Sequence, residues 1–409
     1  MKLKFCLTIY FIIILFSGCI NKKISETINN KGVNLSKFTI ITSENRPEEL
    51  SILFIGDIMQ HNLQIQSAYR KETDSYDFSG QFEFFTDVIK SCDITIANLE
   101  VSFGGAPYSG YPGFSCPDEL ITAIKNAGIN YLVTANNHVY DNDKYGFNRT
   151  IDLIDNAGIH RTGIYKNKAD KTKNNPMIIN EKGFKIAVFN YTYGVNLYDT
   201  KPSTTIVNIF DKNVIERDLT SVKDSLCDIV IVFMHWGQEY ERMQNESQEE
   251  YAEFCFQNGA DLVIGSHPHV IQPFERYDYV MPDGSKKDVL LAYSLGNFIS
   301  NYDKWRYCDG GATLKVKFTK SKNKKVQISE AGYILIWVYK VVENNILYHR
   351  VLPVSKFEND ETMSNESRNQ MNRFINDSRN HLDSNNINMH EYLFDNIRNE
   401  WIIDGKLTK

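Results

Sequence analysis

The sequence lacks the motifs of several common enzyme classes. Its 409 residues contain no Gly-x-x-x-x-Gly-Lys-Ser/Thr phosphate loop, no Gly-x-Gly-x-x-Gly dinucleotide fingerprint and no Gly-x-Ser-x-Gly nucleophile elbow. Nucleotide-dependent ligation and serine hydrolysis therefore have no basis in the sequence. There is also no internal repeat, because the two Asn-Ala-Gly-Ile segments mark similar helix ends rather than duplicated units.

An excess of basic residues is also absent. The chain has 45 lysines and arginines against 51 aspartates and glutamates, which gives a net charge of −6 at pH 7. The basic residues are scattered, whereas a protein that holds a phosphate backbone needs a basic stripe or patch. We therefore expect no nucleic-acid partner.

The cysteines form neither a disulfide framework nor a metal knuckle. Of seven, two lie in the first 19 residues, and the other five are widely spaced, with no Cys-x-x-Cys pair. We interpret these five as mostly small, buried apolar side chains.

The N-terminal residues 1–19 resemble a bacterial lipoprotein signal peptide. The segment MKLKFCLTIYFIIILFSGC has two lysines, an apolar stretch too short for a comfortable spanning helix, and small residues before Cys19. Cys19 would then carry the lipid, with residues 20–48 as a polar tether to the folded body. The alternative is an uncleaved membrane anchor. Both place the rest of the chain in the cell envelope, outside the cytoplasmic membrane.

One pattern recurs in the body of the chain. Short apolar runs are each followed at once by polar residues, as in SILFIGD, DITIANLE, NYLVTANNH, DIVIVFMHWGQE, ADLVIGSHPH and VLLAYSLGN. Helical patterns lie between most of them: FEFFTDVIKSC, DELITAIKNAGI, FNRTIDLIDNAGI and ESQEEYAEFCFQNGA. Strands that are apolar on both faces and alternate with helices predict an α/β fold with a mostly parallel sheet covered on each side.

The polar residues after these strands predict a site. Ligands of such sheets bind beyond the carboxyl ends of the strands, where the pattern collects Asp57, Glu100, Asn137, His138, His235, His267 and His269. Imidazole, carboxylate and amide oxygen are ligands for a borderline divalent ion such as zinc, manganese or iron. Two ions about 3.5 to 4 Å apart can clamp a phosphoryl or carbonyl centre. We therefore predict a site for one or two divalent metal ions.

Each candidate residue also has a purely structural interpretation. Asp57 or Asn137 could simply belong to a turn, and His235 could be a histidine packed in the core. The pair His267 and His269 is harder to explain in this way, because polar rings on either side of a proline rarely serve a core. Proline at the position between them would bias the preceding residue toward an extended path and so present both rings.

The ordered motifs GDIM, ANLE, ANNHVYD, HWGQEY, GSHPHV and SLGNF resemble those of the capsule-synthesis proteins of the poly-γ-glutamate (CapA) type, which are similar in fold to calcineurin-like metallophosphoesterases. The resemblance covers about residues 50–320. It implies an α/β, four-layer αββα sandwich over residues 49–355, in which the strands beyond about residue 310 complete the second sheet. It also implies a role at the membrane in making, exporting or anchoring poly-γ-glutamate or a similar capsular polymer.

The resemblance also implies roles for residues. It places metal ligands at Asp57, Glu100, Asn137, His235, His267 and His269. His138 takes the place of the catalytic acid, and we assign Glu239 a catalytic role in orienting a ligand histidine, the alternative being a solvent-facing helix start. Asp141 is expected to be a helix cap or a partner of the site rather than a ligand. Two positions depart from the phosphoesterase pattern: Met59 stands in place of a histidine, with His61 two residues further on, and Glu100 replaces an aspartate.

Two functional hypotheses follow. The first is a metal-dependent hydrolase or transferase that acts on a phosphoester or a γ-amide-linked polymer. The second is a non-catalytic component of a capsule assembly apparatus that binds an anionic polymer, such as poly-γ-glutamate or a capsular polysaccharide, beside capsule synthesis or export proteins. Residues 356–409 are polar with weak helical spacing, and we expect a peripheral helical tail there.

Overall fold

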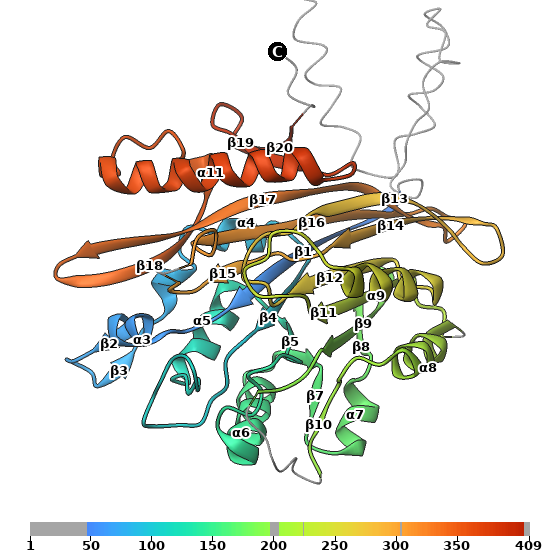
Figure 1. Ribbon diagram of the computed structural model, residues 1–409, viewed down its shortest axis with the longest axis horizontal. Coiled ribbons are helices and arrows are strands. Elements are labelled where there is room, and N and C mark those ends of the chain that lie inside the picture. Colours follow the sequence, from blue (N-terminus) through green and yellow to red (C-terminus); the bar gives the residue numbers. More distant parts are fainter. Residues whose placement is uncertain (1–46, 197–203, 224, 303–304, 405–409) are drawn as a thin grey trace, which may run out of the picture. The chain divides into compact units, whose positions relative to one another are not determined.

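Two β-sheets packed face to face form the centre of the fold in the computed structural model (Figure 1), which describes residues 47–196, 204–223, 225–302 and 305–404. The predicted signal peptide, Cys19 and nearly all of the predicted tether lie outside the described residues. Among those that are described, we find no helix that is both long and apolar enough to cross a membrane.

The larger sheet combines the first parallel strands with most of the C-terminal ones. Its order is β20 (Glu400–Ile403), β19 (His390–Asp395), β17 (Val326–Glu343), β16 (Gly310–Lys320), β1 (Glu48–Ile58), β4 (Ile94–Leu99), β5 (Tyr131–Val133) and β6 (His160–Thr162), with β15 (Asn297–Ile299) beside β1 and β18 (Ile346–Pro353) beside β17. Strands β1, β4, β5 and β6 are mutually parallel, and β16 runs antiparallel to β1.

The smaller sheet holds the strands from the middle of the chain. Its order is β13 (Phe274–Val280), β14 (Lys286–Ala292), β12 (Leu262–Ser266), β11 (Ile229–His235), β9 (Phe184–Thr192) and β8 (Met177–Glu181). The four inner strands are parallel, and the edge strands β8 and β13 are antiparallel to their neighbours. Two short pairs stand apart: β2 (Tyr69–Arg70) with β3 (Ser75–Tyr76), and β7 (Ile164–Tyr165) with β10 (Ile206–Val207).

Helices complete the layers. They are α3 (Asn62–Ala68), the 3-10 turn η4 (Ser79–Gln81), α4 (Thr86–Lys90), α5 (Glu119–Ala127), α6 (Asp143–Asn156), α7 (Lys168–Asn174), α8 (Lys212–Lys223), α9 (Glu246–Gln257), α10 (Val354–Phe357) and α11 (Asn365–Asn385). Apolar residues of α4 and α5 share one core cluster with the outer face of the larger sheet, and those of α8 and α9 share another with the smaller sheet. The expected four-layer αββα arrangement is thus confirmed.

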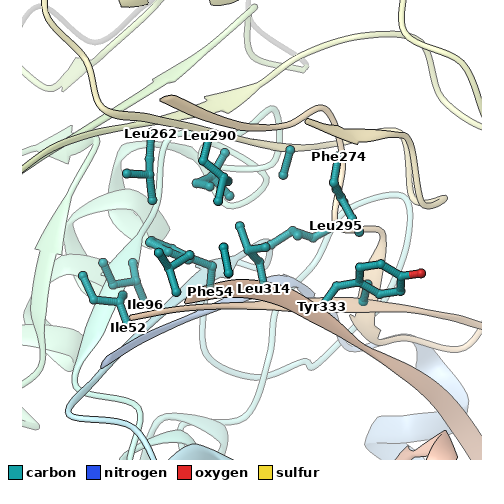
Figure 2. Packing of buried hydrophobic residues seen from close by; sticks show 14 of the residues in the cluster. Ile52, Phe54, Ile96, Leu262, Phe274, Leu290, Leu295, Leu314 and Tyr333 are labelled. Atoms are coloured by element: carbon teal, nitrogen blue, oxygen red, sulfur yellow. The ribbon is translucent and has the colours of Figure 1, made fainter. Parts of the chain in front are cut away.

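The main core lies between the two sheets. Figure 2 shows Leu262 and Leu290 of the smaller sheet facing Phe54, Ile96 and Leu314 of the larger one, and all five are buried. Because both sheets present an apolar inner face, their strands have few polar residues until they reach their carboxyl ends. This explains why the motifs stand out in the sequence where each strand ends.

Local signals set the helix boundaries, of which the glycine ends were expected from the sequence. Gly128 directly follows helix α5 and has a left-handed φ of 104°. Glycine adopts this conformation freely because it has no Cβ. Helix α9 begins with a capping box in which Asn245 accepts a hydrogen bond from the Gln248 backbone N–H and the Gln248 side chain bonds back to Asn245.

The structure corrects three expectations about the sheets and the tail. The motif-bearing strands divide between two sheets, as the family resemblance implied, rather than forming the one sheet that the apolar pattern predicted. The strands after residue 310 join the larger sheet beside β1 rather than completing the second. The segment after residue 356 is helical only in part, since β19 and β20 extend the larger sheet, and it is not peripheral, since α11 contributes Met371, Phe374, Ile375 and Leu382 to the main core. Figure 1 shows α11 lying along β17.

Candidate metal centre

The seven residues predicted from the strand ends gather where the two sheets present their carboxyl ends. The larger sheet and its loops supply Asp57, Glu100, Asn137 and His138, and the smaller sheet and its loops supply His235, His267 and His269. All seven side chains are buried. The sheet ladders fix their positions, because β1 pairs Asp57 with Asn98 of β4 and β11 pairs His235 with Ser266 of β12.

One amide joins the two carboxylates. The Asn98 Nδ2 donates to Asp57 Oδ1 at 2.7 Å and to Glu100 Oε2 at 3.2 Å. The second oxygens, Asp57 Oδ2 and Glu100 Oε1, accept no hydrogen bond from any residue that the structure describes. A buried anionic oxygen without a donor is strongly unfavourable unless a cation lies beside it.

Two histidines face these oxygens, and polar side chains contact their ring nitrogens. The His235 Nε2 lies 3.6 Å from Glu100 Oε1 and 2.8 Å from Asn137 Oδ1, while its Nδ1 lies 3.0 Å from Ser266 Oγ. The His269 Nε2 lies 3.8 Å from Glu100 Oε1. Its Nδ1 lies 3.1 Å from Asn297 Oδ1 and 3.2 Å from Asp57 Oδ2. The contact of Ser266 with the His235 Nδ1, the nitrogen remote from Glu100, is of the kind that orients an imidazole toward a metal.

The backbone of the His-Pro-His segment is unusual. His267 has a φ of +100° and His269 a φ of +60°, and neither is a glycine, so both residues occupy a region that ordinary side chains rarely adopt. The expectation of an extended path at His267 is therefore wrong. The strained loop turns both rings into the same buried space, with ring centroids 5.9 Å apart.

Burial sets the charge of the site. It raises the pKa of Glu100 well above its usual range, and the nearby charges of Asp57 and, to a lesser extent, Glu239 add to this rise. Burial also lowers the pKa of His235 and of His267 well below the usual value, with neighbouring histidines contributing. The two imidazoles are therefore neutral near pH 7, as ligands must be.

These distances fit a cation. Two groups of three side chains, Glu100 with His267 and His269, and Asp57 with Glu100 and His235, each offer ligand atoms that lie within 4.8 Å of one another. Glu100 belongs to both groups, as a bridging carboxylate would. The donor set of imidazoles and carboxylates, with two oxygens lacking a hydrogen bond, can hold a divalent metal ion.

His138 stands outside these groups. Its Nδ1 lies 2.8 Å from Asp141 Oδ2, an oxygen that also accepts the Phe114 backbone N–H at 2.8 Å. The Phe114 ring packs edge-on against the imidazole, with centroids 4.7 Å apart. Asp141 is thus a partner that fixes the ring, one of the two roles expected of it.

Three other predicted or considered positions lie apart from the ligand groups. Glu239 is half-buried in the loop after β11, and Ser266, not Glu239, is the hydrogen-bond partner of the His235 Nδ1; a catalytic role for Glu239 stays a prediction. Met59 is fully buried. The His61 Nδ1 accepts the Asn301 backbone N–H at 3.2 Å, and His61 belongs to neither of the two ligand groups.

Sequence reasoning missed the aromatic surroundings of the histidines. The Tyr193 ring centroid lies 4.7 Å from that of His267, and the Tyr302 centroid 5.0 Å from that of His269. The role of Ser266 was also missed, although it directly precedes His267. No periodicity marks the two tyrosines, because loops place them, and Ser266 is the last residue of β12, where a serine is not conspicuous.

The geometry defines a buried, metal-competent centre at the shared end of a two-sheet α/β fold. Residues 51–302 match the family model of the bacterial capsule synthesis protein PGA_cap. The chain therefore belongs to this family, as the motif resemblance implied.

Curated relatives carry the same description. The chain is 28% identical over 265 residues to the capsule biosynthesis protein CapA of Bacillus anthracis, a match that covers 62% of this chain and 60% of that protein. It is 27% identical over 261 residues to the PGA biosynthesis protein CapA of Bacillus subtilis (strain 168), covering 61% and 63%. The match thus spans less than two thirds of the length of either relative.

Among solved structures, the chain is similar to the NAD nucleotidase NadN of Haemophilus influenzae, with a TM-score of 0.44, 13% identity, and coverage of 83% of this chain and 61% of that one. It is also similar to the calcineurin-like phosphoesterase YfkN of Bacillus subtilis, with a TM-score of 0.40, 13% identity, and coverage of 82% and 99%.

Proposed function

We propose that the chain is a membrane-anchored CapA-type protein that acts in the synthesis, export or anchoring of capsule or poly-γ-glutamate, and that its buried centre is a divalent-metal hydrolase site of the phosphoesterase-like class. Membership of the capsule synthesis family supports the first part. The arrangement of the buried histidines and carboxylates supports the second.

One observation carries the metal site. Asp57 Oδ2 and Glu100 Oε1 are buried and accept no hydrogen bond from the described residues. The imidazole of His269 lies 3.2 Å from Asp57 Oδ2, and those of His235 and His269 lie 3.6 and 3.8 Å from Glu100 Oε1. A purely structural cluster would satisfy these oxygens with donors, since buried polar groups in folded proteins almost always have partners. A divalent ion supplies the missing positive charge.

The chain's own residues suit a hydrolysis. The ion would be held by Asp57, Glu100, Asn137, His235, His267 and His269. A bound divalent cation polarises a phosphoryl or carbonyl oxygen and makes water more acidic. His138, whose Nδ1 is fixed by Asp141, would release a proton from Nε2 to the leaving oxygen. The burial of the centre excludes bulk water and strengthens each of these electrostatic interactions.

Elemental analysis tests the proposal. We expect the purified protein to hold near-stoichiometric manganese, iron or zinc, and the His267→Ala, His269→Ala double variant to lose it. The matched control changes His160 and His390, two exposed histidines, to alanine and should keep the metal. A wild-type protein that takes up none of the three metals on dialysis would contradict the proposal.

A second candidate function is a non-catalytic component that binds a polymer. The observation that favours it is Met59, a buried apolar side chain at a position where the phosphoesterase pattern has a ligand histidine. Metal-dependent hydrolysis of bis(p-nitrophenyl) phosphate, lost in His138→Asn, supports the enzyme. Metal-loaded protein that binds polymer but hydrolyses no phosphoester or γ-glutamyl substrate supports the binding component.

The proposed anchor at Cys19 has a separate test. In cells fed a labelled fatty acid, the full chain should take up label and sediment with membranes, and the Cys19→Ala variant should do neither. A Cys19→Ala variant that still sediments with membranes but carries no label would instead indicate the uncleaved apolar anchor.

A further inference from the structure

A groove of about 440 Å³ lies next to the metal centre. It runs between the loop after β15, strand β17 and helix α11, and its lining includes Tyr302, Trp305, Arg306, Asp309, Lys340 and Arg373. Tyr302 borders both the groove and the metal centre, since it lines the groove and its ring centroid lies 5.0 Å from that of His269. The volume is in the range of ligand sites in proteins.

An aromatic surface continues from the metal centre into this groove. The Trp305 indole is 53% exposed, although an indole would normally be buried. It stacks on Tyr240 with centroids 4.4 Å apart and planes 6° from parallel. Tyr240 in turn lies 6.2 Å from His269. The stacking on Tyr240 therefore places the exposed indole beside the centre.

The groove also carries an excess of positive charge. Its lining includes three cations, Arg306, Lys340 and Arg373, and one carboxylate, Asp309. Arg306 forms ion pairs with Asp377 of α11 and, at 4.0 Å, with Asp309, so the excess charge lies at Lys340 and Arg373. Arg373 is exposed and makes no ion pair or hydrogen bond with any residue that the structure describes. Its guanidinium is therefore available for a ligand carboxylate, phosphate or sulfate.

We infer that this groove binds an acidic glycan, with a sugar ring on Trp305 and an acidic group at Arg373. The face of an indole carries partial negative charge and attracts the C–H bonds that one side of a pyranose ring presents. Poly-γ-glutamate offers carboxylates to the arginine but no ring to the indole. The aromatic surface thus favours a charged polysaccharide over a polypeptide. This inference rests on the proposed function only in taking the groove as part of the site that acts on the polymer.

The test is an array of acidic and neutral oligosaccharides together with γ-glutamate oligomers, probed with the full chain. We expect binding to acidic glycans and weak or no binding to neutral glycans and γ-glutamate oligomers. Trp305→Leu, which keeps apolar bulk but removes the ring, should weaken binding about five- to tenfold. Trp305→Phe, which keeps a ring, should retain most of it.

Charge and fold are tested in the same assay. Arg373→Ala should weaken binding to acidic glycans, whereas Arg217→Ala, at an exposed arginine of α8, should leave it unchanged. Both Trp305 and Arg373 are exposed, so the variants should keep the thermal stability of the parent. Binding to γ-glutamate oligomers alone, binding to no glycan, or full binding by Trp305→Leu would overturn the inference.

Metal content measured on the same samples separates this inference from the proposed function. Trp305→Leu should keep its metal while losing the glycan, because the indole contacts none of the ligand atoms directly. A protein that binds acidic glycans without holding metal would support the glycan-binding groove and contradict the proposed metal-dependent hydrolase.

Discussion

At the scale of single residues, the site depends on hydrogen bonds that hold otherwise mobile groups. Asn98 bridges the two carboxylates, while Ser266 and Asn297 contact the Nδ1 atoms of His235 and His269. The second oxygens of Asp57 and Glu100 accept no hydrogen bond from the described residues. The consequence is a centre whose geometry is set before any ion binds, which favours both affinity and correct orientation.

The contact between His138 and Asp141 leads to a prediction. Asp141→Asn replaces the carboxylate that fixes the His138 Nδ1 and stabilises its positive charge, so kcat for a metal-dependent phosphodiester hydrolysis should fall about 10- to 100-fold. KM and metal content should change little, because Asp141 contacts no ligand group. The measurement is steady-state kinetics with bis(p-nitrophenyl) phosphate over a range of pH.

Two further variants sharpen this experiment. Asp152→Asn, at a carboxylate of α6 that pairs with Lys166 on the surface, should keep full activity. The His138→Asn, Asp141→Asn double variant should be no slower than His138→Asn alone, because the aspartate acts through the histidine. Additive losses would show that Asp141 matters only for the loop that it holds at Phe114.

Some residues of the site could be predicted from the sequence, and others could not. The strand-end residues could be predicted because a buried strand makes any polar residue at its end conspicuous. The conformation of His267 could not, since a positive φ in a non-glycine residue has no signature in the sequence and depends on the loop around it. The partner role of Ser266 was hidden for a similar reason, because serine is common in turns.

At the scale of elements, α11 shows how a polar sequence can contribute to a core. Its 21 residues have few apolar side chains, and four of these, Met371, Phe374, Ile375 and Leu382, fall on one stripe that is buried. The stripe follows helical spacing but holds only four apolar residues among 21, which is why the sequence favoured a peripheral tail. The tertiary contact of α11 with β17 decides its place in the fold.

Phe374 is the residue through which this packing can be tested. Its ring is 2% exposed, and a Cβ at Gly310 of β16 would lie 2.8 Å from it, so glycine at that position makes room for the ring. Phe374→Ala should lower the free energy of unfolding by about 3 to 5 kcal/mol. Urea titration followed by circular dichroism measures this loss.

The neighbouring Asn376 provides the control. It lies on the exposed side of the same helix, and Asn376→Ala should change the free energy of unfolding by less than about 0.5 kcal/mol. If Phe374→Ala were equally mild, α11 would be the peripheral element that the sequence suggested, and its packing on the main core would be wrong.

At the scale of the whole molecule, the centre joins two sheets through residues that lie far apart along the chain. Asp57 and Glu100 come from the larger sheet, and His235 and His267 from the smaller one. The apolar pattern predicted that strand ends converge, but only the family resemblance implied two sheets, because apolar inner strands of either sheet look alike. A metal ion bound here would connect the two sheets at one end of their shared core.

This arrangement predicts that metal stabilises the whole fold. An ion that binds the folded chain and not the unfolded one adds about 2.7 kcal/mol at a free concentration of 100 times its Kd. We expect the melting temperature to rise when manganese or zinc is added to chelator-treated protein and to fall again with EDTA. The His267→Ala, His269→Ala variant should not respond, whereas the control with alanine at positions 160 and 390 should respond like the parent. Bound metal with no change in melting temperature would place the ion at a site that does not link the two sheets, contrary to the geometry of Asp57, Glu100 and His235.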